Sequence, residues 1–149
     1  MPHPENHSAG APPFPVTRIL VPVDMRHAEA SQLAVETAVY FARAARAELS
    51  ILTVAYPLGT HMTQMSEAHR PEFEAFVAGE AKRLDYPLKP LFHVHEAVNE
   101  VIQKVIRQHG VDFVVMATHH PRLTDHLFGS HASQTALHAN CAVLIVRGG

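Results

Sequence analysis

Residues 111–147 read VDFVVMATHHPRLTDHLFGSHASQTALHANCAVLIVR, and this stretch decides the fold. It opens with an apolar run at 113–117 and closes with a second apolar run at 142–146. Between them lie a polar, histidine-rich segment and a helical pattern that starts at Gly129-Ser130. This order of elements is the layout of a phosphate site in an α/β protein: a strand, a loop, a glycine at a helix start, a helix and another strand.

The composition indicates one soluble globular domain, with 149 residues, 47% hydrophobic and 17% charged. A net charge of -2, counting histidine as neutral, gives no strong field for nucleic acid or anionic lipid. No apolar run approaches the roughly 20 residues of a membrane-spanning helix, and the N-terminus does not resemble a secretory signal. Cys141 is the only cysteine, which excludes an intramolecular disulfide and fits a reducing cytosol. We therefore expect a cytoplasmic protein with no nucleic-acid partner and no membrane insertion.

The rest of the chain alternates apolar strands with amphipathic helices. Residues 1–15 are rich in proline and histidine without periodicity, so we predict a flexible tail, with 16–149 forming one domain. The patterns predict further strands and helices, with Gly110 as a left-handed cap and Pro71 near its helix start. The strands are expected at 18–23, 49–54 and 91–94, and the helices at 28–46, 66–84 and 98–108.

This alternation predicts the fold class. Strands that are apolar on both faces and alternate with helices form a parallel sheet covered on both sides. Right-handed crossovers then limit the topology to a doubly wound, five-stranded sheet. Ligands of such sheets lie beyond the C-terminal ends of the strands, at the switch point. That rule selects Pro22, Val23 and Asp24 after the first strand, Val54 after the second, and residues 117–130 after the fourth.

Four pieces of sequence carry a family resemblance: VPVD (21–24), MATH (116–119), LFGS (127–130) and HANCAVLIVR (138–147). With the element order, they make residues 17–147 similar to the universal stress protein family, closest to its F- and G-type members. The resemblance implies a flavodoxin-like fold that binds ATP, or ADP or AMP, with or without Mg²⁺, at the C-terminal edge of the sheet. It also implies a homodimer in which the last strand pairs with its twin.

The chain departs from the family's glycine pattern, which is Gly, two residues, Gly, nine residues, Gly, then Ser or Thr. Ala117 and His120 take the first two glycine positions, and only residues 121–128 separate His120 from Gly129. Glycine allows backbone to approach phosphate closely and to adopt a positive φ. The departure is either a variant shared with the F- and G-type members or a loss of nucleotide binding.

The helix start at Gly129 and Ser130 has the chemistry of an anion site. Free N–H groups and the positive end of the helix dipole favour phosphate, although the same pair is also an ordinary helix start. Loop side chains are candidate phosphate partners, while His131 either contacts phosphate or crowds it. The loop candidates are His119, His120 and Arg122, and Met116, Ala117 and Ala132 complete the expected nucleotide-binding set.

Asp24 and Val54 are the expected contacts for the nucleoside. As the resemblance implies, the Asp24 carboxylate accepts from ribose hydroxyls or adenine; alternatively it caps the helix at 28–46, and both interpretations can hold. Val54 packs against adenine and offers its backbone to the base edge, or it is ordinary core.

His93 and His95 share one face of a strand and, with His119 or His120, could bind zinc or nickel. We expect no metal there, because a His-x-His pair arises easily by chance in a chain with 13 histidines.

Two functions remain open. One is a nucleotide-binding stress or signalling module with an unidentified protein partner, in which nucleotide orders the loop. The other is a regulatory or structural dimer of the same fold without nucleotide. Neither a Walker A sequence nor an obvious base-and-metal arrangement is present, so we expect binding with at most slow hydrolysis.

Overall fold

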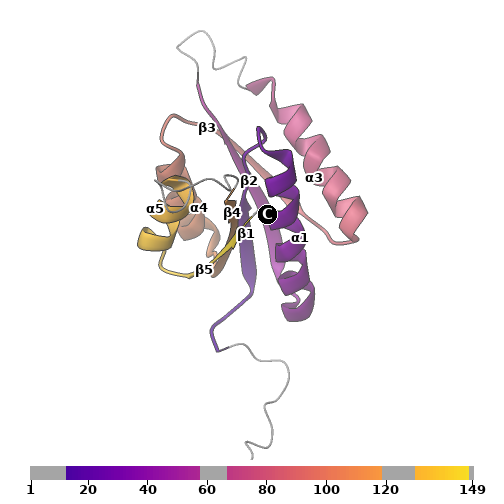
Figure 1. The fold of residues 1–149 in the computed structure, drawn as a ribbon, viewed down its shortest axis with the longest axis vertical. Helices are drawn as coiled ribbons and strands as arrows, with labels where there is room; N and C mark the ends of the chain where they lie inside the picture. Colours follow the sequence, from indigo (N-terminus) through magenta and orange to yellow (C-terminus); the bar gives the residue numbers. More distant parts are fainter. Residues whose placement is uncertain (1–12, 58–66, 119–129, 148–149) are drawn as a thin grey trace, which may run out of the picture.

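The protein, described by a computed structural model over residues 13–57, 67–118 and 130–147, has five parallel strands in one sheet. The sheet order is β3-β2-β1-β4-β5, with β1 at the centre. The predicted doubly wound, flavodoxin-like α/β fold is therefore confirmed (Figure 1). The elements are β1 (Arg18–Pro22), α1 (Ala28–Ala45), β2 (Glu48–Ala55), α3 (Arg70–Leu84), β3 (Lys89–Val94), α4 (Val98–His109), β4 (Phe113–Thr118), α5 (Ser130–His138) and β5 (Ala142–Arg147).

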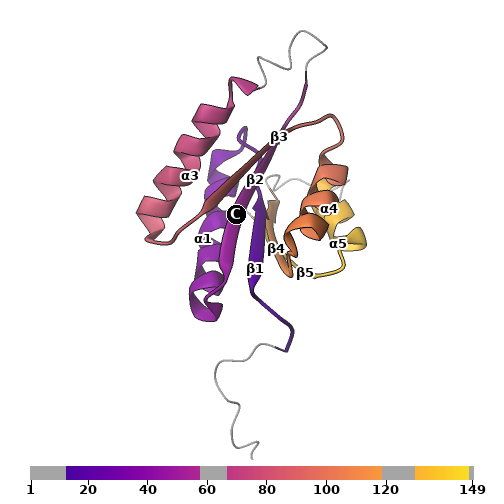
Figure 2. The same ribbon diagram turned by 180° about the vertical axis from the view of Figure 1, so that it is seen from behind.

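Helices cover both faces of the sheet. Helices α1 and α3 lie on one face, and α4 and α5 lie on the other, as the two opposite views show (Figures 1 and 2). Successive β1 residues alternate between two cores: Ile19 and Val21 pack with α1 and α3, and Leu20 packs with α4. Burial on both faces explains why the strands read as continuous apolar runs.

Several predicted element ends differ from the observed ones by a few residues. Helix α1 ends at Ala45 rather than Arg46, because Arg46 adopts the left-handed conformation (φ 57°) and caps the helix. Helix α3 begins at Arg70 rather than residue 66, with Pro71 in its first turn, where a missing N–H costs nothing. Strand β3 begins at Lys89 and includes Pro90, which an edge strand tolerates. Gly110 is the left-handed cap of α4, as predicted, with φ 61°.

The central strand β1 is fixed at its N-terminal end by Asp112. The Asp112 carboxylate accepts the backbone N–H groups of Thr17, at 2.9 and 3.0 Å, and of Arg18, at 3.0 Å. It also accepts the Thr17 hydroxyl. These bonds join the chain that enters β4 to the chain that enters β1.

No helix within the described ranges is long and apolar enough to span a membrane.

Candidate functional site

The C-terminal ends of the parallel strands lie along one edge of the sheet, where β1 and β4 part. These two strands pair only at Ile19↔Phe113 and Leu20↔Val114, although β4 continues to Thr118. By contrast, β1 stays paired with β2 along its whole length, up to Pro22↔Leu52. After β1 the chain continues to β2 on one side of β1, whereas β4 lies on the other side. The place where β1 and β4 separate is therefore the topological switch point, where α/β sheets bind ligands.

The backbone just beyond β1 is held firmly to β2. The Val23 N–H donates to the Leu52 carbonyl at 2.8 Å, and the Thr53 hydroxyl donates to the Val23 carbonyl at 3.1 Å. Thr53 is buried, with 7% of its surface exposed, so its hydroxyl needs such a partner. These bonds fix the position from which Asp24 leaves the strand.

The backbone of Asp24, rather than its carboxylate, supports the start of α1. The residue preceding the helix is His27, whose side chain makes no capping hydrogen bond. Instead the Asp24 carbonyl accepts the His27 N–H and the Ser31 hydroxyl, each at 2.9 Å. The described hydrogen bonds of the Asp24 side chain go to Arg26 and not to α1, so they do not support its interpretation as a cap for this helix.

Arg26 holds both oxygens of the Asp24 carboxylate. Oδ1 accepts the Arg26 backbone N–H and Nε–H, each at 3.0 Å, and Oδ2 accepts Nη2–H at 2.9 Å. Partial burial raises the pKa of Asp24, but the bonds and charge of Arg26, with a smaller effect of His27, outweigh burial and leave that pKa lowered. Asp24 is thus ionised at neutral pH and engaged by a neighbouring cation.

Arg26 is a residue of this edge that sequence reasoning missed. Its only signal is local: an arginine two residues after a strand-ending aspartate, the spacing of a side chain that folds back on the turn.

The remaining described candidates contribute mainly apolar surface. Met116 and Ala132 are buried in the core shared with α4, with 5% and 4% of their surface exposed. Val54 is half-buried and packs against that same core, whereas Ala117 packs against the opposite one. Pro22 is half-buried at the end of β1. Any direct contact of Met116 or Ala132 with a ligand would therefore use backbone atoms.

The phosphate half of the predicted site is only partly described. His119, His120, Arg122 and Gly129 lie outside the described residues, as do the side chains of Ser130 and His131. The backbone of α5 begins at Ser130, which agrees with the predicted helix start. This helix start follows β4, whose last residue is Thr118.

The two histidines near the end of β3 have separate environments. His95 accepts the Ala97 N–H on Nδ1 at 2.9 Å, which leaves Nε2 as the donor of its neutral ring. Burial lowers the pKa of His93, and the nearby Lys104 adds to this effect. Among the described residues, no three His, Cys, Asp or Glu side chains come together in an arrangement that could hold a metal ion.

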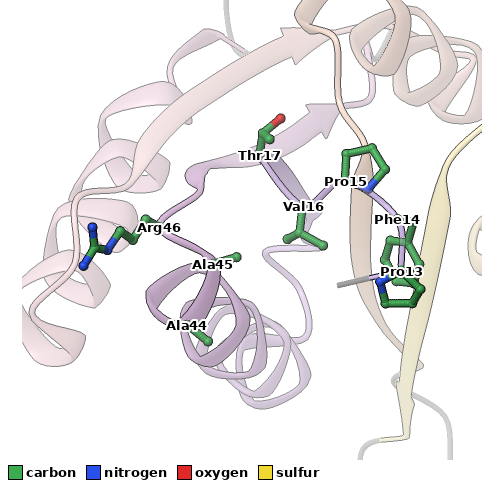
Figure 3. Close-up of a pocket in the computed structure, with 8 residues that line it drawn as sticks. All are labelled: Pro13, Phe14, Pro15, Val16, Thr17, Ala44, Ala45 and Arg46. Carbon is green, nitrogen blue, oxygen red and sulfur yellow. The ribbon is translucent and has the colours of Figure 1, made fainter. Parts of the chain in front are cut away.

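A cavity of about 540 Å³ lies at the opposite edge of the sheet from the strand ends, where β1 begins and α1 ends. Its lining includes Phe14, Val16 and Ala45, and Arg46 directs its guanidinium away from Phe14 (Figure 3). Phe14 also stacks on Phe113, with ring centroids 6.1 Å apart. The cavity is therefore separate from the candidate site.

Known proteins resemble this chain in amino-acid sequence. A model of the universal stress protein family matches residues 15–147. Universal stress protein G of Shigella flexneri is 41% identical over 54 residues. That match spans 36% of this chain and about a third (35%) of the relative.

Solved structures share the fold at lower identity. The universal stress protein UspA from Lactobacillus plantarum superposes with a TM-score of 0.76 at 24% identity, covering 89% of this chain and 98% of that one. The universal stress protein from Archaeoglobus fulgidus in complex with dAMP superposes with a TM-score of 0.64 at 18% identity, covering 87% and 97%. At these identities the likeness concerns the fold.

Proposed function

The chain belongs to the universal stress protein family, and from this premise we propose that it is a cytoplasmic adenine-nucleotide-binding module. The module serves stress response or signalling, acts as a homodimer, binds ATP, ADP or AMP with or without Mg²⁺, and hydrolyses ATP slowly at most. Nucleotide binding orders the loop after β4 and so changes the surface that a protein partner meets.

The parting of β1 from β4 beyond Leu20 and Val114 carries this proposal. It opens the sheet edge between Asp24, which can accept from a ribose, and the start of α5 at Ser130, whose backbone N–H groups suit phosphate. Val54, near the end of β2, and Ala117, near the end of β4, are the apolar residues proposed to contact the base.

Nucleotide-bound proteins of the same fold support the proposal. Structures similar to this chain contain cAMP, dAMP and AMP. All three ligands contain adenine, a ribose or deoxyribose, and one phosphate group, and the proposal assigns recognition of the nucleoside part to Asp24 and Val54. Phosphate recognition falls to the start of α5 and the preceding loop, where Gly129, His119 and His120 are the candidates.

The homodimer part of the proposal rests on β5. Among the described strands, β5 stands last in the sheet and pairs with β4 alone. Residues 142–146 are apolar but only half-buried among the described residues, so part of the apolar surface of this strand is accessible. An exposed apolar edge strand invites pairing with another chain. Sedimentation at micromolar concentration tests this point: a dimer is expected, and a monomer would contradict it.

A nucleotide-free dimer of the same fold is the second candidate. The observation that favours it is the pairing of Asp24 with Arg26, which already engages the carboxylate expected to hold ribose. The replacement of two family glycines by Ala117 and His120 points the same way.

Release of bound small molecules from purified protein separates the two candidates. We expect mass spectrometry to find an adenine nucleotide, and millimolar ATP to raise the melting temperature. Gly129→Val should abolish that shift, because a side chain at this position blocks close approach of phosphate to the backbone. Gly79→Val is the matched control, since Gly79 has open space around it on α3. Absence of both released nucleotide and thermal shift in the wild type would reject the first candidate.

A further inference from the structure

The acceptor positions of the Asp24 carboxylate are mostly occupied within the protein itself. An ionised carboxylate offers about four acceptor positions, two on each oxygen. Oδ1 already accepts two N–H groups of Arg26, and Oδ2 accepts a third. His27 Nε2 lies a further 4.0 Å from Oδ2. About one acceptor position, on Oδ2, is therefore open to a ligand.

A ribose presents two adjacent hydroxyl donors, which exceeds what remains open on Asp24. Both hydroxyls can bond the carboxylate only if the Arg26 guanidinium withdraws, which frees one position on each oxygen. The backbone N–H of Arg26 would keep its bond to Oδ1, so the turn itself need not change. The Arg26 side chain is 83% exposed, and exposed ion pairs are weak, so withdrawal into solvent is inexpensive.

We propose that Arg26 sets the affinity of this site by competing with the ribose hydroxyls for the Asp24 carboxylate. The inference rests on the proposed nucleotide function and adds a regulating residue to it. Arg26 acts here as an internal occupant of the nucleoside subsite rather than as a phosphate ligand. The competing donors, Nε and Nη2, are both on its guanidinium, so replacing that group alone removes the competition.

Adenosine is the probe that isolates this competition, because it carries the ribose but no phosphate. Arg26→Met keeps the aliphatic stem and removes the guanidinium. Calorimetric titration should show adenosine binding to Arg26→Met about two- to fivefold more tightly than to the wild type, the range expected for an exposed ion pair. Arg107→Met is the matched control, an exposed arginine in the last turn of α4 at the other edge of the sheet, and should leave adenosine affinity unchanged.

Other results of these titrations would overturn the inference. Adenosine affinity that is unchanged or weaker in Arg26→Met excludes competition for Asp24. A loss of ATP affinity with unchanged adenosine affinity would make Arg26 a phosphate ligand instead. If neither adenosine nor ATP binds the wild type or the variant, the proposed function fails and this inference fails with it. Binding that is present but insensitive to Arg26 removes this inference alone.

The ion pair can also be tested without any ligand. Because Arg26 lowers the pKa of Asp24, that pKa should rise in ligand-free Arg26→Met, as followed by carboxyl NMR. An Asp24 pKa that is the same in both proteins would show that the guanidinium does not occupy the carboxylate in solution, and would overturn the inference.

Discussion

The Asp112 carboxylate accepts the Thr17 backbone N–H at 2.9 and 3.0 Å, a contact between residues 95 positions apart. With the bonds to Arg18 N–H and the Thr17 hydroxyl, it fastens the entry of β4 to the entry of β1. These two strands share few backbone pairs, so the carboxylate supplies part of the connection that the ladder lacks.

Asp112→Ala should therefore destabilise the fold. Loss of hydrogen bonds to a charged group is expected to lower the free energy of unfolding by about 1–3 kcal/mol. Urea denaturation followed by circular dichroism measures the change. Glu100→Ala, an exposed carboxylate on α4, is the control and should change stability by less than about 0.5 kcal/mol. Equal effects of the two substitutions would show that the Asp112 bonds do not matter for stability.

Replacing two glycines by alanine, one at a time, should change the stability of the fold in opposite directions. Gly110 has φ +61°, and a Cβ placed there would lie 2.9 Å from Nη1 of Arg18, so Gly110→Ala should destabilise by about 1–2 kcal/mol. Gly79 lies within α3 with nothing near its Cβ position, so Gly79→Ala should stabilise by about 0.5–1 kcal/mol. Melting temperatures of the two variants give the comparison, and a shift of both in the same direction would contradict it.

The Tyr86 hydroxyl should stabilise the end of α1. It donates towards two carbonyls, those of Ala42 and Ala47, and the Arg43 guanidinium lies 5.7 Å from the centroid of its ring. Tyr86→Phe removes the donor but keeps the ring, and should cost about 1 kcal/mol of unfolding free energy. Tyr40→Phe, at a side chain 73% exposed, is the control and should have little effect. Chemical denaturation that gives the same value for both variants would rule out this role.

His93 should make stability depend on pH. Burial, then the charges of Lys104, His109, Arg70 and His95, lower its pKa in the folded state. The unfolded chain, with a histidine pKa of about 6.5, therefore binds the proton more readily than the folded chain. The stability present above the unfolded-state pKa of about 6.5 is consequently lost as the pH falls below that value towards the lower pKa of folded His93.

The measurement compares unfolding free energies at about pH 7.5 and pH 5, on either side of that value. Wild type should lose more stability on acidification than His93→Gln, which cannot titrate. His138→Gln, at an exposed position in α5, should behave like the wild type. Identical pH dependence of His93→Gln and wild type would show that the His93 environment is not protonation-sensitive.

The sequence predicts the order and type of the elements because strands buried on both faces leave a strong apolar signal. It also predicts Gly110 as a cap, since few residues other than glycine adopt a positive φ readily. The sequence misplaces the end of α1, because Arg46 adopts the left-handed conformation and nothing in the sequence, such as a glycine, indicates this. The start of β3 is misplaced for a different reason: Pro90 reads as a break, although a sheet edge accepts it.

The sequence predicts where the candidate site residues lie in the fold better than it predicts which side chains they contact. The topological rule places Asp24 and Val54 at the C-terminal edge of the sheet, where the structure has them. It says nothing of the Asp24 side chain, whose partner is fixed by turn geometry over two residues rather than by periodicity. Arginines that follow a strand are usually solvated, so only the three-dimensional arrangement distinguishes Arg26 from these.

The central place of β1 has a consequence for biosynthesis. A ribosome completes β1 first among the strands, yet its neighbour β4 comes only after residue 112 has been made. Until then one side of β1 has no partner, and the nascent chain can form at most the β3-β2-β1 half of the sheet. Contacts this distant in sequence form slowly, and unpaired strand edges expose a chain to aggregation. We therefore expect nascent chains that stop before β4 to depend on chaperones, and the sheet to close only when synthesis is nearly complete.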